Sequence, residues 1–326
     1  MSQTTRTYLD FERPIAELES KIEELESVLE RNGADAPDAA DEVAKLRGKA
    51  TDQLKSLYGK LDAWGKTMVA RHPERPHLKD YIAELVTDFE ALAGDRRFGE
   101  DHAIVGGTGR IHGRPVVIIG HEKGHDTQSR LTHNFGMARP EGYRKAVRLM
   151  DLAERFDLPV VTFVDTAGAY PGLGAEERGQ AEAIARSTER CLSLKTPLVS
   201  IITGEGGSGG AVALASANTV LMLEHSIYSV ISPEGCASIL WRDGSRAKDA
   251  ALAMKITAQD LQELKIIDTI VEEPLGGAHR DRQLAIQRVG EALDSALSSL
   301  DGLSPDELKQ NRRERFLRIG RSLLDG

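Results

Sequence analysis

Short apolar runs alternate with amphipathic segments through most of the chain. Residues 115–120, 160–165 and 198–203 are mostly apolar, which is typical of strands that are buried on both faces of a sheet. Residues 141–156 and 175–192 carry apolar side chains at helical spacing. Because strands that alternate with helices pair in parallel through crossover connections, this pattern predicts an α/β fold.

The predicted α/β region begins near Ile104 and continues toward residue 300. After the third strand we expect a helix at 208–217, strands at 219–223 and 227–231, and helices at 245–264 and 282–300. Beyond them lies a basic run made of Arg312, Arg313, Arg315 and Arg318. We interpret this run as the solvated face of a helix rather than a nucleic-acid site.

The N-terminal part of the chain is predicted to be helical. Apolar residues recur at helical spacing in segments 15–29 and 41–60, which an acidic, turn-rich linker joins at 32–41. A further helix is expected at 78–92, ended by Gly94. We therefore divide the chain into an N-terminal helical region at 1–95, which is a plausible subunit contact, an α/β domain at 96–300 and a C-terminal helical tail at 301–326.

Composition narrows the class of protein. The chain has 326 residues and a formal net charge of −9, which argues against nonspecific nucleic-acid binding. Cys191 and Cys236 make no metal-binding spacing, and the polar N-terminus has no signal-peptide pattern. We expect a cytoplasmic protein with reduced thiols. Residues 206–223 carry no charge, but their glycines and serines indicate a core segment rather than a membrane span.

A glycine-rich stretch follows the third predicted strand. The glycines at 204, 206, 207, 209 and 210 separate the apolar run Leu198–Ile202 from a small-residue helix. We interpret the glycine cluster as a turn. The first N–H groups of a helix have no partner inside it and favour negative charge, and glycine lets a ligand approach the main chain. The stretch therefore predicts a site for an anion or an oxyanion.

Four kinds of anion site are candidates for this layout, of which the first is excluded. A phosphate loop requires a lysine that is absent here. The pattern Gly204-x-Gly206-x-x-Gly209 fits the dinucleotide fingerprint, and Glu224 lies close enough in sequence to be its acidic residue, although it does not end a second strand in the usual way. Backbone donors for a developing enolate or tetrahedral oxyanion are a third possibility.

The fourth is a serine hydrolase. Gly206-x-Ser208-x-Gly210 fits the nucleophile elbow, with Ser208 as nucleophile. The base and orienting acid would come from His225 or His279 and from Asp243 or Asp268. No His-Gly-Gly-Gly segment supplies the second oxyanion donor, and Ser208 is alternatively a small residue at a helix start.

Two further motifs can each be interpreted either as a functional site or as a structural segment without a function of its own. His121-Glu-Lys-Gly-His125 matches the zincin pattern, but it follows a strand directly and contains Gly124, so we expect no zinc site there. The segment from Asp165 to Gly172 follows a strand and is either a turn or a rigid ligand loop.

Seven strings together resemble a known family. They are Asp10-Phe-Glu-Arg-Pro-Ile15, Asn134-Phe-Gly-Met-Ala-Arg-Pro-Glu-Gly-Tyr143, Asp165-Thr-Ala-Gly-Ala-Tyr-Pro-Gly172, Gly174-Ala-Glu-Glu-Arg-Gly-Gln180, Gly204-Glu-Gly-Gly-Ser-Gly-Gly210, Tyr228-Ser-Val-Ile-Ser-Pro-Glu-Gly-Cys-Ala237 and Glu273-Pro-Leu-Gly-Gly-Ala-His-Arg280. In this order they look like the α subunits of bacterial acetyl-coenzyme A carboxylase carboxyltransferases, over residues 8 to 320. One departure is His125, where we expect a basic residue after Lys123-Gly124.

The resemblance implies a crotonase-like spiral of ββα units and an assembly of two α and two β subunits, with the active site between α and β. Zinc is expected on the β partner only, and no metal on this chain. The implied reaction moves a carboxyl group from carboxybiotin, on the biotin carboxyl carrier protein that biotin carboxylase charges, to acetyl-CoA. The product is malonyl-CoA, in the first committed step of fatty acid biosynthesis.

The resemblance also assigns roles to residues. It places the N–H groups of Gly206 and Gly207 as an oxyanion hole for the biotin ureido oxygen, so no side-chain base is required. Substrate-binding residues are expected at Gly168, Ala169, Tyr170, Pro171, Gly172, Ser208 and Gly209. Contacts to CoA phosphates are open, with Arg178, Arg242 and Arg246 as candidates. No membrane or nucleic-acid partner is expected.

Overall fold

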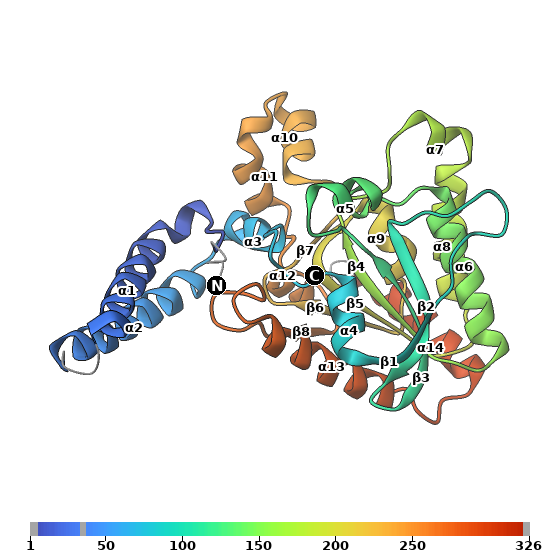
Figure 1. Ribbon diagram of the computed structural model, residues 1–326. Coiled ribbons are helices and arrows are strands. Elements are labelled where there is room, and N and C mark those ends of the chain that lie inside the picture. The colour runs from blue at the N-terminus through green and yellow to red at the C-terminus, as the bar shows by residue number, and fades with distance from the viewer. Residues whose placement is uncertain (1–5, 33–36, 322–326) are drawn as a thin grey trace.

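An eight-stranded mixed sheet forms the centre of the molecule (Figure 1). The computed structural model describes residues 6–32 and 37–321. The strands are β1 Val86–Ala91, β2 Ile104–Ile111, β3 Arg114–His121, β4 Val160–Thr166, β5 Leu198–Gly207, β6 Thr219–Leu223, β7 Ile227–Ser229 and β8 Thr269–Val271. Their order is β1-β2-β3-β4-β5-β6-β8. The short strand β7 lies outside this order and pairs with the last residues of β5, after the part of β5 that pairs with β6. Pairing is antiparallel from β1 to β3 and parallel elsewhere.

Helices cover both faces of this sheet. They are α1 Arg13–Asn32, α2 Pro37–Tyr58, α3 Ala63–Ala70, α4 Leu78–Leu85, α5 Thr127–Thr132, α6 Pro140–Arg155, α7 Leu173–Glu177, α8 Gln180–Ser193, α9 Ser208–Ala215, α10 Pro233–Trp241, α11 Ala247–Ala253, α12 Ala258–Glu263, α13 Arg282–Ser298 and α14 Pro305–Arg318. One core cluster joins the sheet to α6, α8 and α9, and a second joins it to α4 and α13. The predicted α/β class is therefore confirmed.

Side-chain alternation along the strands explains the two core layers. In β3, Val117 and Ile119 belong to the α6 side, whereas Val116 and Ile118 belong to the α4 side. All four side chains are at most 1% exposed. A strand buried on both faces must be apolar at consecutive positions, which is why the central strands were recognisable as continuous apolar runs.

The α1 and α2 helices form a hairpin that extends away from the sheet (Figure 1). The guanidinium of Arg280 joins the start of α1 to the body, with Nη1 2.7 Å from a carboxylate oxygen of Glu19 and Nη2 3.1 Å from one of Glu12. The predicted linker at 32–41 is shorter than expected, because α2 begins at Pro37, a residue suited to the first helical turn. Residues 33–36 of that linker lie outside the described residues.

The helix predicted at 78–92 is wrong in its second half. The helix α4 ends at Leu85, and residues 86–91 form β1, which pairs with β2. Valine, threonine and phenylalanine in this stretch favour a strand once a neighbouring edge is available. The first sheet strand thus lies before the boundary that we placed between residues 95 and 96.

Two other predicted helices are interrupted. The segment 175–192 is divided between α7 and α8 by Gly179, which has a left-handed φ of 81°. The segment 245–264 is divided between α11 and α12, where Lys255 has a φ of 55° and Thr257 caps the next helix. The prediction also missed α3, α5, α10, β2 and β8.

Only part of the basic run near the C-terminus is the solvated helix face that we predicted, because Arg313 and Arg318 are exposed and the other two arginines are not. Arg312 is fully buried and Arg315 is 6% exposed. The Arg312 guanidinium donates to the carbonyl oxygens of Cys191, Leu194 and Thr196. These hydrogen bonds attach α14 to the end of α8, because the last carbonyls of a helix have no partner inside it.

The uncharged stretch 206–223 folds into the end of β5, α9 and β6, and most of its residues are buried. Within residues 6–32 and 37–321, no helix combines the length and apolarity needed to cross a bilayer.

Candidate functional site

The glycine-rich stretch spans a junction between a strand and a helix. Gly204, Gly206 and Gly207 are the last residues of β5 rather than the turn that we predicted, and α9 begins directly at Ser208. Gly206 lies opposite Thr166 of β4, and the stretch is also paired with β7. The strand therefore runs straight into the helix start without an intervening loop.

Glycine is required at this junction for close packing. A Cβ on Gly207 would overlap the carbonyl oxygen of Ala167, and one on Gly210 would lie 2.9 Å from the backbone nitrogen of Ala169. Both neighbours are backbone, which cannot swing away as a side chain does. The junction is thus packed directly against the segment that follows β4.

The start of α9 presents backbone donors. Its N-cap is Gly207, which has no side chain that could accept a hydrogen bond from the first N–H groups. The first N–H groups of the helix have no partner inside it and lie at the positive end of its dipole. Ser208 has a left-handed φ of 54°, which is costly for a residue with a Cβ and common at functional sites. Such a junction can stabilise negative charge on an oxygen.

The segment after β4 is a rigid loop. The hydroxyl of Thr166 donates to the carbonyl of Gly168 and accepts from its N–H. The N–H of Tyr170 donates to the carbonyl of Ala138, and the guanidinium of Arg139 lies 4.7 Å from the Tyr170 ring centre. This rigidity agrees with the ligand-loop interpretation.

The predicted binding residues are only partly brought together. The structure places Gly168 beside Ser208 and Ala169 beside Gly210, at the junction. Tyr170 instead packs toward Arg139, and a Cβ on Gly172 would overlap its ring. Pro171, between them, is exposed.

A mainly apolar cavity of about 490 Å³ adjoins the junction. It is lined by Ser208, Gly209, Val212, Tyr228, Ser229, Val230, Met254, Lys255, Ile256, Leu261, Leu264 and Ile266. Ser208 and Gly209 thus lie where a ligand in this cavity would meet the start of α9. The cavity suits a ligand with an apolar body and one oxygen that takes up charge.

A smaller cavity of about 220 Å³ is lined by Ala167 and Glu205, close to the junction. It contains a group of charged side chains that the sequence analysis did not predict. Its lining includes Arg71, Lys123, Asp165 and Glu205. Nζ of Lys123 lies 2.6 Å from Oδ1 of Asp165, and Nε of Arg71 lies 2.7 Å from Oε1 of Glu205. No short-range pattern could have revealed this group, because its members come from four separate segments.

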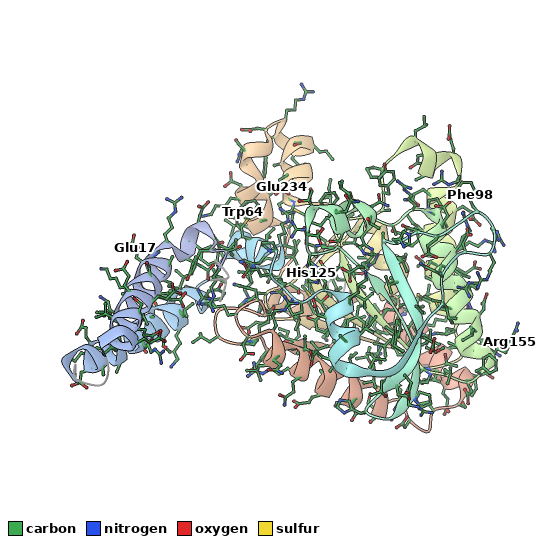
Figure 2. The ribbon with its side chains drawn as sticks, in the orientation of Figure 1. Glu17, Trp64, Phe98, His125, Arg155 and Glu234 are labelled. Atoms are coloured by element: carbon green, nitrogen blue, oxygen red, sulfur yellow. The ribbon has the colours of Figure 1, made fainter. Side chains whose placement is uncertain are left out.

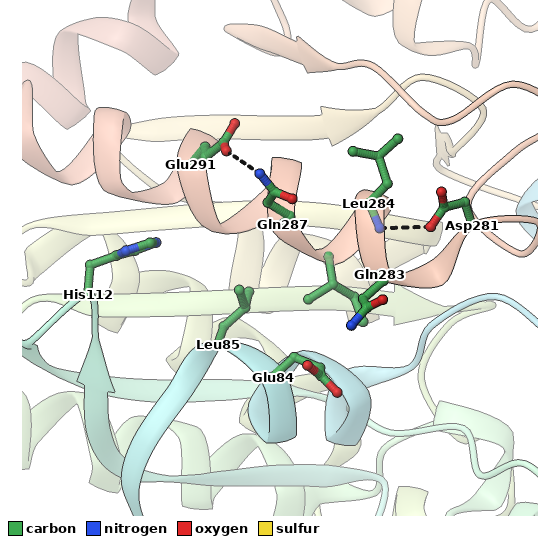
Figure 3. A pocket seen from close by; sticks show the side chains of 9 residues that line it. Glu84, Leu85, His112, Asp281, Gln283, Leu284, Gln287 and Glu291 are labelled. Atoms are coloured by element: carbon green, nitrogen blue, oxygen red, sulfur yellow. Dashed lines mark hydrogen bonds between the residues drawn. The ribbon is translucent and has the colours of Figure 1, made fainter.

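A further cavity, of about 590 Å³, lies elsewhere (Figure 3). Glu84 and Leu85 of α4 line it together with residues of α13, and none of the predicted site residues takes part. The close-up shows a hydrogen bond between Gln287 and Glu291 along α13. This groove presents no group with the reactivity that the junction offers.

The hydrolase triad is not formed, so that alternative is wrong. His225 packs 5.5 Å from the Tyr58 ring, and His279 stacks on His72 with ring centres 3.8 Å apart. The two candidate acids are also engaged elsewhere: Asp243 caps a short helix, and Asp268 pairs with Arg315.

The zincin string has no zincin geometry. His121 ends β3, and His125 lies in the loop before α5, where it stacks on His77 at 4.5 Å. The two histidines therefore do not share a helix face, which the motif requires. The carboxylate of Glu122 accepts the N–H groups of Lys79 and Gly124 instead.

Among the described residues, Glu12, His72 and His279 bring metal-ligand atoms within 4.8 Å of one another. The Glu12 carboxylate already accepts from Tyr58 and from Arg280. His72 bonds to the carbonyl of Thr7 through one ring nitrogen and accepts a backbone N–H through the other. These partners and the adjacent guanidinium disfavour a cation at this cluster.

The arginines considered for CoA phosphates have their own surroundings. Arg178 pairs with Glu141 at 2.6 Å, and Arg246 pairs with Asp249 and lies over the Trp241 ring. Arg242 is exposed at the end of α10.

Comparison with known proteins identifies close relatives. A family model described as acetyl co-enzyme A carboxylase carboxyltransferase-like matches residues 8–320. A protein of Caulobacter vibrioides strain NA1000, named acetyl-coenzyme A carboxylase carboxyl transferase subunit alpha, is 69% identical over 315 residues, which are 97% of this chain and 98% of the relative. A protein of the same name from Methylobacterium sp. strain 4-46 is 65% identical over 318 residues, which are 98% of this chain and all of the relative.

Solved structures share the fold at low sequence identity. A transcarboxylase 12S structure with methylmalonyl-coenzyme A bound gives a TM-score of 0.57 at 18% identity, covering 69% of this chain and 41% of that one. A Pseudomonas malonate decarboxylase hetero-tetramer in complex with coenzyme A gives 0.56 at 18%, covering 70% and 93%. The expected crotonase-like fold is thereby confirmed.

Proposed function

The chain belongs to the acetyl-coenzyme A carboxylase carboxyltransferase family, and from that membership we propose how its strand–helix junction takes part in the reaction. The reaction is the transfer of a carboxyl group from carboxybiotin to acetyl-CoA, with malonyl-CoA as product. The observation that carries the proposal is the junction of β5 and α9, where backbone donors border an apolar cavity.

The chemistry places negative charge on two oxygens. When the N–C bond of carboxybiotin breaks, its electron pair is shared with the ureido oxygen, and the ureido nitrogen takes a proton from the acetyl methyl group. The second charge is on the thioester oxygen of the enolate that then attacks the carbon of CO2. Each oxygen needs donors aimed where charge develops, in a site shielded from water.

We assign the ureido oxygen to this chain. The N–H groups of Gly206 and Gly207 are its proposed donors, supported from behind by the dipole of α9. The bicyclic urea has an apolar body, which matches the apolar lining beside Ser208 and Gly209. Negative charge that is stabilised by backbone donors requires no side-chain base, so the hydroxyl of Ser208 has a packing role only.

The pairing of β5 with β7 points to two further backbone donors at the same junction, the N–H groups of Ser208 and Gly209. Gly206 and Gly207 lie opposite Tyr228 and Ser229 in the ladder, whereas Ser208 and Gly209 lie in the first turn of α9. A helix leaves the N–H groups of that turn without partners. We therefore propose that the oxyanion site comprises the backbone N–H groups of residues 206 to 209.

The chain acts as a subunit, as the names of its relatives say. The finer proposal is an α2β2 assembly in which the zinc-bearing β partner supplies donors for the enolate, with carboxybiotin delivered on its carrier protein. Exposed apolar side chains support a partner contact: Val230, which lines the cavity beside the junction, is 84% exposed, and Ile239 and Leu240 of α10 are 71% and 64% exposed. The helices α10 and α11 extend from the body at this end of the molecule (Figure 1).

The test is reverse carboxyl transfer from malonyl-CoA to a soluble biotin derivative, followed as acetyl-CoA. The chain is assayed alone and with its β partner. Activity that requires both chains supports a shared site. A verified complex of the two chains without activity contradicts the proposed reaction.

A further inference from the structure

The strand β5 contains a bulge immediately before Gly206. Val164 of β4 pairs with Ile202, and Thr166 pairs with Gly206. Between these positions β4 advances by two residues and β5 by four, so β5 carries two additional residues. Bulges redirect the backbone that follows them and are frequent beside active sites. The direction of the Gly206–Gly207 backbone thus depends on how the bulge is held.

Side chains also bond to the backbone of the bulge, whose last residues pair with β7. The N–H of Glu205 donates to Oδ1 of Asp165 over 2.9 Å. The carbonyl oxygen of Thr203 accepts from Arg75, over 2.8 Å from Nη2 and 3.2 Å from Nε. A Cβ on Gly204 would overlap the Asp165 carboxylate, so glycine at that position lets the carboxylate reach the backbone.

The Asp165 carboxylate is itself ionised and held in place. It is 6% exposed, and Nζ of Lys123 lies 2.6 Å from its Oδ1. Burial would raise the pKa of Asp165, but the charge of Lys123 and the hydrogen bonds from Lys123 and from the N–H of Glu205 lower it below its ordinary value. A charged acceptor makes a stronger hydrogen bond to Glu205 N–H than a neutral one.

The Glu205 side chain is clamped as well. Its carboxylate lies 2.7 Å from Arg71 and 3.4 Å from Lys123. Arg71, at the end of α3, also pairs at 2.6 Å with Glu234 in the first turn of α10 (labelled in Figure 2). Both the backbone and the side chain of Glu205 are therefore restrained by charged partners.

We infer that Asp165 is a positioning residue that aims the Gly206–Gly207 backbone by holding the N–H of Glu205 in the bulge of β5. The inference rests on the proposed role of Gly206 and Gly207. Loss of this hydrogen bond frees the bulge, and a displacement of about 1 Å at reacting groups costs on the order of 10²-fold in rate.

Two substitutions separate the hydrogen bond from the ion pair. Asp165→Asn keeps an oxygen that accepts from Glu205 but loses the charge, whereas Asp165→Ala loses both. Asp268→Asn is the matched control, because Asp268 likewise accepts a backbone N–H, from Val220, and pairs with an arginine, Arg315, at the other end of the sheet. All three are measured in the complex with the β partner.

We expect Asp165→Ala to lower kcat on the order of 10²-fold, with an unchanged KM for malonyl-CoA, because the donors act in the transition state. Asp165→Asn should recover most of that loss, and Asp268→Asn should keep the kcat of the unsubstituted complex. Equal losses of kcat in Asp165→Asn and Asp165→Ala would overturn the inference, because the ion pair alone would then explain the loss. A change confined to KM would also overturn it, because Asp165 would then affect substrate binding rather than the transition state.

Amide hydrogen exchange provides a readout that does not depend on activity. Exchange at Glu205 and Gly206 should be faster in Asp165→Ala than in Asp165→Asn, with the rest of β5 unchanged. Unchanged exchange at these amides would overturn the inference even if the variant is inactive. If the unsubstituted complex shows no carboxyl transfer, the proposed function fails, and exchange alone decides whether Asp165 holds the bulge.

Discussion

Arg75 and Glu273 form a two-point ion pair in the interior of the protein. Nη1 of Arg75 lies 2.7 Å from Oε2 of Glu273, and Nη2 lies 2.8 Å from Oε1. Their side chains are 2% and 0% exposed. Burial would raise the pKa of Glu273, but Arg75 lowers it to about 2. The pair connects the segment before α4 to the segment that follows β8, and Arg75 also donates to the carbonyl oxygen of Thr203.

Removing one partner of this pair should destabilise the protein strongly. We expect Arg75→Met to lower the free energy of unfolding by about 3–5 kcal/mol, because an uncompensated buried carboxylate remains. The control is Arg114→Met, which breaks a more exposed pair with Asp301 and should cost about 1 kcal/mol or less. Denaturant unfolding measures both, and equal effects would contradict the buried-pair argument.

The two junction glycines should differ in their tolerance of a methyl group. A Cβ on Gly207 meets the backbone of Ala167, whereas one on Gly206 meets the Tyr228 ring at 2.9 Å, and a side chain can shift. Gly207→Ala should therefore lower kcat on the order of 10²–10³-fold, and Gly206→Ala should lower it less.

The control for both is Gly48→Ala in α2, where a Cβ meets nothing within 4 Å. It should keep activity and raise the free energy of unfolding by about 0.5–1 kcal/mol, since alanine favours a helix interior. Steady-state rates of reverse transfer give the order. A Gly207→Ala complex with unreduced kcat would remove this residue from the proposed site.

Ser208 should be dispensable for chemistry but strained. Ser208→Ala keeps the left-handed φ of 54° and should retain most activity, since the proposed donors are backbone groups. Ser208→Gly should raise the free energy of unfolding by about 1 kcal/mol, because glycine adopts this conformation without steric cost. Loss of activity in Ser208→Ala together with fluorophosphonate labelling of the unsubstituted protein would contradict this assignment.

Buried histidines should make the protein sensitive to acid. Burial lowers the pKa of His279 from 6.5 to about 2, with His72 and Arg75 contributing, and burial lowers that of His121 to about 4. In the unfolded chain both take up protons below pH 6.5, while the folded protein keeps them neutral. Stability is therefore lost as the pH falls from 6.5 toward those folded values.

Each such histidine contributes up to about 1.4 kcal/mol per pH unit to this loss. His279→Phe keeps a flat ring that cannot be protonated, and we expect it to reduce the slope of unfolding free energy between pH 6 and 5. Denaturant unfolding at both pH values tests this. An unchanged slope would show that His279 does not carry the effect.

Arg312 should be essential for the attachment of α14. Its guanidinium also contacts the side-chain oxygen of Asn218, in addition to three backbone carbonyls. Arg312→Lys should lower the free energy of unfolding by about 1.5–3 kcal/mol, because an ammonium cannot reach all of these acceptors. Arg313→Lys, one position along the same helix and exposed, should change it by less than about 0.5 kcal/mol.

Much of the fold was predictable from local pattern. The central strands and α6 were recognised because residues such as Ile118 and Ile119 are apolar at consecutive positions, as burial on both faces demands. The glycine stretch was also recognised, since few other arrangements require so many residues without a Cβ. The family strings then pointed to the reaction.

Other features depended on contacts between distant segments. Residues 86–91 became β1 because β2 offers an edge to pair with, and Arg312 is buried because the end of α8 offers carbonyl acceptors. Arg75, Lys123 and Asp165, which hold the bulge, come from separate parts of the chain. The amino-acid sequence alone therefore determined which segments are apolar and where glycine is needed. Only the tertiary structure decided the strand register and the partners of buried charges, because both are set by residues that meet only after folding.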